Sequence, residues 1–145
     1  MKYTSAIDIN LPLNRVIELF NNPDNLKYWM PELISSELIS GTLGKTGAVG
    51  KLRFKDGNKE YEMIETVTTK NLPSIFARTY ELKNIFITIK DSFIPITDNK
   101  TRYISENEVA LSGMLKCVAF ILKAKFKMRT KKQLSSFKDF AENRL

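Results

Sequence analysis

A glycine-rich stretch at residues 41–51, GTLGKTGAVGK, has the composition of a phosphate-binding loop. The P-loop of nucleotide-hydrolysing enzymes requires a glycine, four further residues and then Gly-Lys-Ser/Thr, between a strand and a helix. The Gly44-Lys45-Thr46 triplet would need a glycine at position 39, which is Ile39. The residues that follow alternate with the period of a strand and do not open a helix. We therefore predict a glycine-rich β-hairpin and exclude nucleotide hydrolysis by a P-loop.

The sequence contains no histidine and a single cysteine, Cys117. The missing histidine excludes the Ser-His-Asp and Cys-His arrangements that activate nucleophiles, and the two facts together exclude most zinc sites. We therefore predict no metal, no cofactor and no catalytic residue. Cys117 lies in an apolar run and is predicted to be a buried, inert thiol. A chain without an internal disulfide is consistent with a reducing cytoplasm, which is the location we expect.

The composition is ordinary for a globular domain. At 145 residues, with 43% hydrophobic and 27% charged residues, the chain is long enough for one core. We expect a single domain over residues 1–145. The first residues, MKYTSAID, include no apolar region, so we expect no signal peptide.

Hydrophobic periodicity and turn residues divide the chain into elements. Residues 2–10 alternate as a strand, and residues 12–21 and 24–29 read as two short helices. After Gly113 neither Gly nor Pro occurs, which predicts one helix of about 30 residues to the end of the chain. The strands predicted between these helices are 33–41, 47–55, 59–70, 74–82, 85–96 and 101–112.

This order of elements predicts an α+β fold. A seven-stranded antiparallel sheet curls and needs cover on its concave side. The only apolar element large enough is the C-terminal helix, on which Leu122, Phe126 and Phe137 share a face. A curved sheet around one helix leaves space between them, which is either filled by side chains or open as a cavity.

The same order resembles the START-like superfamily of SRPBCC proteins, whose helix-grip fold is shared by polyketide cyclases, lipid-transfer domains and the birch-pollen allergen. The resemblance covers essentially the whole chain and depends on the order of several segments. These are LPLNRVIELF at 11–20, NPDNLKYWMP at 22–31, SGTLGKTGAVG at 40–50, KTRYISENEVALSGMLK at 100–116 and QLSSFKDFAE at 133–142. The resemblance implies a hydrophobic cavity between the sheet and the C-terminal helix, but functions diverge within this fold.

Alternation along the strands predicts which side chains face this cavity. The strand at 74–82 is ambiguous because both of its faces carry apolar residues, and we take the face with Phe76 and Arg78 as the inward one. The predicted ligand-binding residues are Trp29, Leu52, Phe54, Tyr61, Met63, Glu65, Phe76, Arg78, Ile87, Ile89, Tyr103, Asn107, Leu122, Phe126, Arg129 and Gln133.

Several of these side chains are polar, and buried charge is costly unless it is paired or hydrated. One hypothesis is that Arg129 or Arg78 holds the anionic or carbonyl end of a ligand, with Glu65 opposite. The alternative is an internal Arg–Glu pair, or side chains that reach the rim of the cavity. Two interpretations of Trp29 also remain. It is either a lid at the entrance of the cavity or a core residue that anchors the second short helix.

The net charge of +7 is concentrated near the end of the chain. Residues 114–145 hold nine Lys or Arg and two Asp or Glu side chains, whereas residues 1–113 hold 14 of each. A charged helix face is usually solvated, but a basic helix with an exposed aromatic residue can contact anionic lipid or an acidic protein. The residues of this predicted contact are Lys116, Phe120, Lys123, Lys127 and Lys131. Nucleic acid is not expected, because no recognition motif is present.

Three functions are open on this evidence. The favoured one is binding or carrying of a small hydrophobic molecule, such as a lipid, an isoprenoid or a polyketide-like compound, which needs only a cavity with a few polar anchors. The second is an enzyme of the polyketide cyclase or dehydratase type, in which Glu65, Tyr61 and Tyr103 would act. The third is a module that contacts a protein or a membrane through the basic helix.

Overall fold

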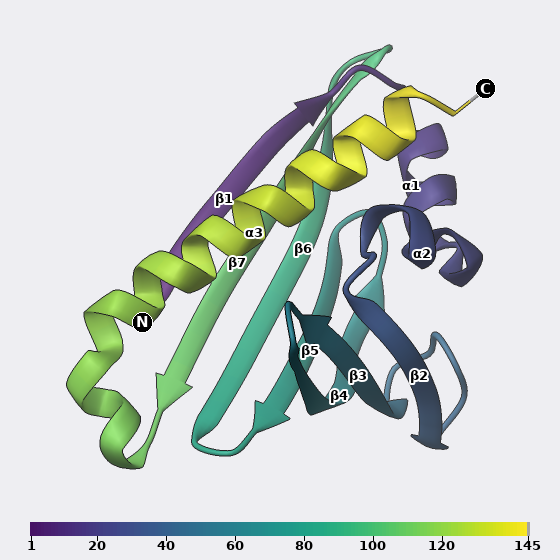
Figure 1. The fold of residues 1–145 in the computed structure, drawn as a ribbon. Coiled ribbons are helices and arrows are strands. Elements are labelled where there is room, and N and C mark those ends of the chain that lie inside the picture. Colours follow the sequence, from purple (N-terminus) through teal and green to yellow (C-terminus); the bar gives the residue numbers. More distant parts are fainter. Residues whose placement is uncertain (145) are drawn as a thin grey trace.

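The computed structural model describes residues 1–144 and shows a curved antiparallel sheet wrapped around one long helix (Figure 1). The seven strands lie in the order β1-β7-β6-β5-β4-β3-β2, so β1 and β2 are the two edges of the sheet. The strands are β1 Lys2–Ile9, β2 Leu33–Ser40, β3 Val49–Asp56, β4 Lys59–Asn71, β5 Ile75–Leu82, β6 Ile85–Thr97 and β7 Lys100–Leu111. The predicted α+β helix-grip fold is confirmed.

Two short helices follow β1, as predicted. The helical segments are α1 Leu13–Asn21, the 3-10 turn η1 Pro23–Asn25, α2 Leu26–Trp29, the 3-10 segment η2 Gly113–Val118 and α3 Ala119–Glu142. On α1, Val16, Leu19 and Phe20 are buried, and their spacing of three and four positions places them on one face. No helix within residues 1–144 is long and apolar enough to cross a membrane.

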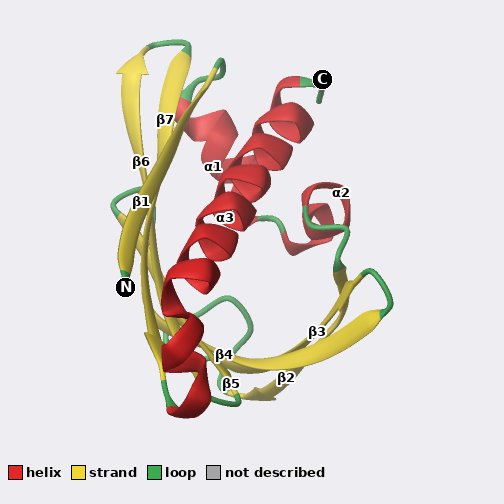
Figure 2. Cartoon of the chain, turned by 60° about the vertical axis from the view of Figure 1, so that its left-hand side comes forward, coloured by secondary structure: helices red, strands yellow, loops and turns green. Residues whose placement is uncertain are grey.

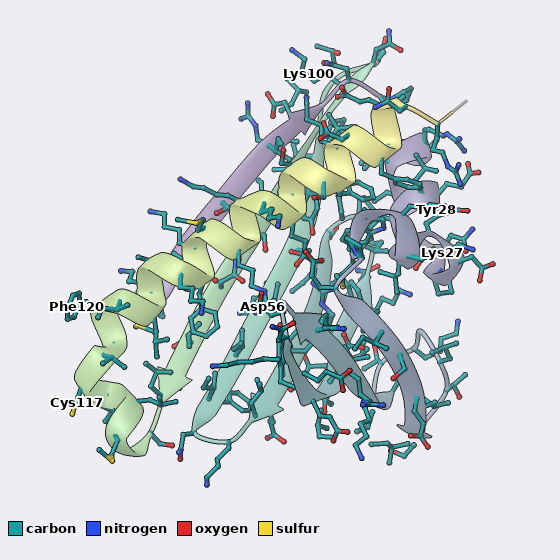
Figure 3. The ribbon with its side chains drawn as sticks, viewed as in Figure 1. Lys27, Tyr28, Asp56, Lys100, Cys117 and Phe120 are labelled. Carbon is teal, nitrogen blue, oxygen red and sulfur yellow. The ribbon has the colours of Figure 1, made fainter. Side chains whose placement is uncertain are left out.

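The prediction that the last helix begins directly after Gly113 is wrong. Residues Gly113–Val118 form a 3-10 segment, and α3 begins only at Ala119. Cys117 lies in η2 and is exposed, so the prediction of a buried thiol is also wrong. Both errors have one cause. Apolar residues here have little to pack against, since η2 projects beyond the main core and Met114 is 88% exposed (Figure 3).

The long helix covers only one side of the concave face. Its contacts with the sheet are mainly with β1 and less with β7 (Figure 2). Near its C-terminus, Leu134, Phe137 and Ala141 are buried in the main core cluster, together with residues of α1. Because α3 lies along the β1 edge, it leaves the concave side of β3, β4 and β5 largely uncovered. This placement is the physical origin of the cavity.

Aromatic rings close the end of the molecule near α1 and α2. Phe20 lies at the centre of this cluster, and its ring centroid is 4.9–6.0 Å from those of its five neighbours. The neighbours are Trp29, Phe76, Phe93, Tyr103 and Phe137. Aromatic pairs in such geometries stabilise a core beyond the area that they bury. The cluster therefore holds the two short helices against both the sheet and α3.

Candidate functional site

A cavity of about 530 Å³ lies between the sheet and α3, a volume within the range of small-molecule sites. Its walls come from the strands β3 to β6, the middle of α3, the short helices, and β2 with the loop that follows it. Leu38, Leu43 and Arg129 line the cavity and are also exposed. The cavity therefore opens to solvent between α3 and the β2 side of the sheet.

Thirteen of the sixteen side chains that the sequence predicts to face a ligand line this cavity. They are Trp29, Leu52, Phe54, Met63, Glu65, Phe76, Arg78, Ile87, Ile89, Asn107, Phe126, Arg129 and Gln133. The structure gathers them because residues two apart on a strand share a face. The inward face chosen for β5, with Phe76 and Arg78, is the one that lines the cavity. Contact of these residues with a ligand stays a prediction.

The other three predicted residues do not line the cavity. Tyr103 is 1% exposed and belongs to the aromatic cluster. Tyr61 stacks on Phe54 with ring centroids 5.5 Å apart, and the Arg129 guanidinium lies 5.2 Å from the Tyr61 ring. Leu122 is half-buried near the N-terminal end of α3.

Sequence reasoning missed the wall formed by β2 and the glycine-rich loop. The pairing of β2 with β3 shifts register twice, which interrupts the alternation of β2, and a loop has no period from which a face can be read. It also missed Lys70 on β4. The pairing of β4 with β5 shifts by one residue between Val67 and Thr69, and such a bulge reverses which positions point inward. Met63, Glu65 and Val67 line the cavity before the shift, and Lys70 lines it afterwards. No residue pattern in β4 indicates this bulge.

A buried ion pair lies at the wall of the cavity. The Arg78 Nη2 donates to Asp91 Oδ2, which also accepts a hydrogen bond of 3.2 Å from the Tyr103 hydroxyl. Asp91 is 1% exposed and Arg78 is 7% exposed. Burial opposes the charge of Arg78, but the negative field of its neighbours, including Asp91, raises the pKa of the guanidinium above its usual value. Arg78 is therefore a fixed cation that already has its counter-ion.

Tyr103 keeps its proton in this network. Burial first, and the nearby Asp91 carboxylate second, raise the pKa of the Tyr103 hydroxyl well above its ordinary value. The internal pair considered from the sequence therefore exists, but its acidic partner is Asp91 and not Glu65. Continuing the inward alternation of β6 beyond Ile89 would have pointed to Asp91.

Glu65 takes part in a separate hydrogen bond within the cavity wall. It accepts a bond of 2.6 Å from the hydroxyl of Tyr80. Burial raises the pKa of the Tyr80 hydroxyl well above its ordinary value. The charge of Arg78 opposes this shift, and the Glu65 carboxylate adds to it. Tyr80 is thus a neutral donor that orients Glu65.

The three residues considered for catalysis are not brought together. Glu65 is bonded to Tyr80, Tyr103 to Asp91, and Tyr61 stacks on Phe54. Trp29 is 3% exposed and packs on Phe20 and Phe137, which favours its interpretation as a core residue. The arrangement is that of an apolar cavity with a few fixed polar groups.

No protein-family model and no curated protein matches the chain. Solved structures match closely in shape. The Zhui aromatase/cyclase from Streptomyces sp. R1128 superposes with a TM-score of 0.78 at 11% identity, covering 99% of this chain and 94% of that one. Ara h 8.0201 gives 0.78 at 10% identity, with 99% of both chains covered.

A third match is norcoclaurine synthase from Thalictrum flavum, solved in complex with dopamine and hydroxybenzaldehyde. Its TM-score is 0.75 at 11% identity, and the match covers 100% of this chain and 88% of that one. Sequence identities this low carry the fold and not the activity. The chain therefore has the helix-grip fold of these SRPBCC proteins, as its resemblance to the START-like superfamily predicted.

Proposed function

We propose that this protein binds or carries a small hydrophobic molecule, such as a lipid, an isoprenoid or a polyketide-like compound, in the cavity between the sheet and α3. The observation that carries the proposal is the cavity itself, about 530 Å³ with mainly apolar walls. Apolar pockets with few polar groups are the usual form of small-molecule sites. The likeness in fold to a synthase solved in complex with dopamine and hydroxybenzaldehyde adds support.

Binding is favoured over catalysis because the carboxylates of Glu65 and Asp91 each already accept a hydrogen bond from a neighbouring side chain. An acid–base catalyst must reach the proton that it moves. Here the Glu65 carboxylate has a tyrosine donor, and the Asp91 carboxylate is shared by Arg78 and Tyr103. These bonds fix the orientation of both carboxylates.

A matched pair of substitutions on β6 tests the proposal. Ile89 lines the cavity, whereas Ile94 is 46% exposed. Ile89→Trp fills part of the cavity and is expected to weaken binding of a neutral solvatochromic dye, Nile red, by at least about tenfold. Ile94→Trp adds the same side chain outside the cavity and should leave the dye affinity unchanged.

Dye fluorescence titration measures both affinities, and native mass spectrometry of the freshly purified protein shows any co-purifying molecule. Equal dye binding by the wild type and Ile89→Trp would contradict the proposal, provided that both variants keep their melting temperatures.

A second candidate function, contact with an anionic membrane, is favoured by the exposed apolar residues beside the lysines of α3. Phe120 is 77% exposed and projects away from the sheet (Figure 3). Lys123, Lys127 and Lys131 follow it at helical spacing, and Ile121 is 55% exposed. Each lysine near an anionic surface contributes about 1 kcal/mol.

Co-sedimentation with vesicles tests this second candidate. We expect binding to vesicles that contain phosphatidylserine at low salt and its loss at high salt, because salt screens the charge. A Lys123→Gln/Lys127→Gln variant should bind more than about tenfold more weakly. No partition at low salt would leave the basic face as a solvated one, and equal partition to vesicles of phosphatidylcholine alone would contradict a contact through charge.

A further inference from the structure

The glycine-rich loop, residues 41–48, is folded onto β4 where that strand forms the wall of the cavity. The Gly47 N–H donates to the Val67 carbonyl over 2.7 Å, and the Val67 N–H donates to the Ala48 carbonyl over 2.9 Å. Further along β4, the Lys70 N–H donates to Thr46 Oγ1 over 3.2 Å. Gly44 and Gly47 have φ angles of +75° and +91°, a conformation that glycine adopts without strain. The loop is therefore held in place above Lys70.

Lys70 is a partly buried cation in the cavity wall. Its Nζ donates to the carbonyl of Gly44 over 2.8 Å and lies 5.4 Å from the ring centroid of Phe76, on which the Arg78 guanidinium also lies at 4.3 Å. Burial lowers the pKa of Lys70, and the charges of Lys45 and Arg78 lower it further. This part of the wall thus holds three cations, Lys45, Lys70 and Arg78.

Among residues 1–144 these three cations form one ion pair, although the carboxylates of Glu37 and Glu65 also line the cavity. Asp91 pairs with Arg78, and none of the ion pairs among residues 1–144 includes Lys45 or Lys70. An ammonium group has three donors, and the Gly44 carbonyl takes one of those on Lys70. A partly desolvated positive charge without a counter-ion is unfavourable, and an anion in the cavity would remove that cost through charge-assisted hydrogen bonds.

We propose that the cavity takes an amphiphile with an anionic end, a carboxylate or a phosphate, and that this end binds at Lys70, beside the exposed Lys45, under the glycine-rich loop. The hydrocarbon part lies against the apolar wall that includes Leu52, Ile87 and Ile89. The proposal depends on the proposed function, because it assigns the chemical class of the molecule that the cavity binds.

The two arginines considered from the sequence are less suited to this role. Arg78 is already neutralised by Asp91. Arg129 is exposed and lies over the Tyr61 ring, so that water competes with a ligand for its donors. Lys70 combines partial burial, a fixed position and the absence of an acidic partner among residues 1–144.

Isothermal titration with three ligands of one chain length tests the assignment: dodecanoate, dodecyl phosphate and the neutral dodecanol. We expect at least one anion to bind wild-type protein about tenfold or more tightly than dodecanol. Lys70→Met should bring this ratio close to one without changing the affinity for dodecanol. The control Lys90→Met removes a lysine from an exposed position of β6 and should keep the wild-type ratio.

The outcomes separate the two proposals. If none of the three ligands binds, the proposed function fails; if all bind equally to the wild type, only the anionic site fails. If Lys70→Met weakens dodecanol as much as the anions, its role is structural and the assignment is wrong. A second variant, Lys45→Met, covers the case of a poorly folded Lys70→Met. An unchanged ratio in every folded variant would also overturn the site. The tighter of the two anions identifies the carboxylate or the phosphate.

Discussion

Replacing Asp91 by asparagine is expected to lower the free energy of unfolding by about 3–5 kcal/mol. The carboxylate is 1% exposed and accepts from both Arg78 and Tyr103. Asparagine keeps the size of the side chain but leaves the guanidinium of Arg78 buried without its ion-pair partner. Because a buried unpaired charge costs far more than a lost surface contact, the effect is large. Urea denaturation followed by circular dichroism measures it.

Two further variants separate charge from packing at this position. Asp98→Asn makes the same chemical change at an exposed turn and should alter the stability by less than about 0.5 kcal/mol. The double variant Arg78→Met/Asp91→Leu removes both charges and should be clearly more stable than Asp91→Asn, since apolar replacements of a buried pair are often neutral. If Asp91→Asn lowers the free energy of unfolding by less than about 1 kcal/mol, the Arg78–Asp91 pair does not stabilise the cavity wall.

Replacing Phe137 by alanine is expected to cost about 3–5 kcal/mol of unfolding free energy. Phe137 is 0% exposed, and its ring packs on Phe20, Trp29 and Tyr103 at centroid distances of 5.0–5.8 Å. The substitution removes apolar contact and leaves a cavity that rigid neighbours fill only in part. Since this ring joins α3 to both short helices and the sheet, thermal and urea denaturation should both show the loss.

Phe120 on the same helix provides the matched control. It is 77% exposed, so Phe120→Ala should change the stability by less than about 0.5 kcal/mol. Similar losses for the two substitutions would mean that α3 is not anchored through its C-terminal half, and the account of the core would then be wrong.

Most of the fold could be predicted because its determinants are local. Alternation, turn residues and the proline-opened helices give the order of elements, and an order with one large apolar helix leaves few ways to cover the sheet. The start of α3 could not be predicted. The sequence after Gly113 contains no helix breaker, and only the tertiary position of η2, beyond the core, decides that these residues are exposed and form a 3-10 segment.

The cavity wall was predictable where strands are regular and not where they are interrupted. Period-two alternation places Phe76 and Arg78 on one face of β5, although it leaves open which face points inward. The Arg78–Asp91 pair can also be predicted once the turn between β5 and β6 is placed. Phe76 lies opposite Asp91, and Arg78 lies opposite Ile89. Arg78 and Asp91 are therefore diagonal neighbours. The β4 bulge and the loop 41–48 depend on backbone geometry that residue types leave open. Lys70 was therefore missed.

The one-sided position of α3 leaves the two edges of the sheet with different amounts of packing. The main core cluster lies where the C-terminal half of α3 packs against the sheet and the short helices, whereas β2 has seven of its eight residues exposed. Little of the apolar burial that stabilises the fold therefore involves β2, the strand that borders the opening of the cavity. We therefore expect displacement of β2 to disturb few core contacts, whereas displacement of α3 would disrupt the aromatic cluster around Phe20.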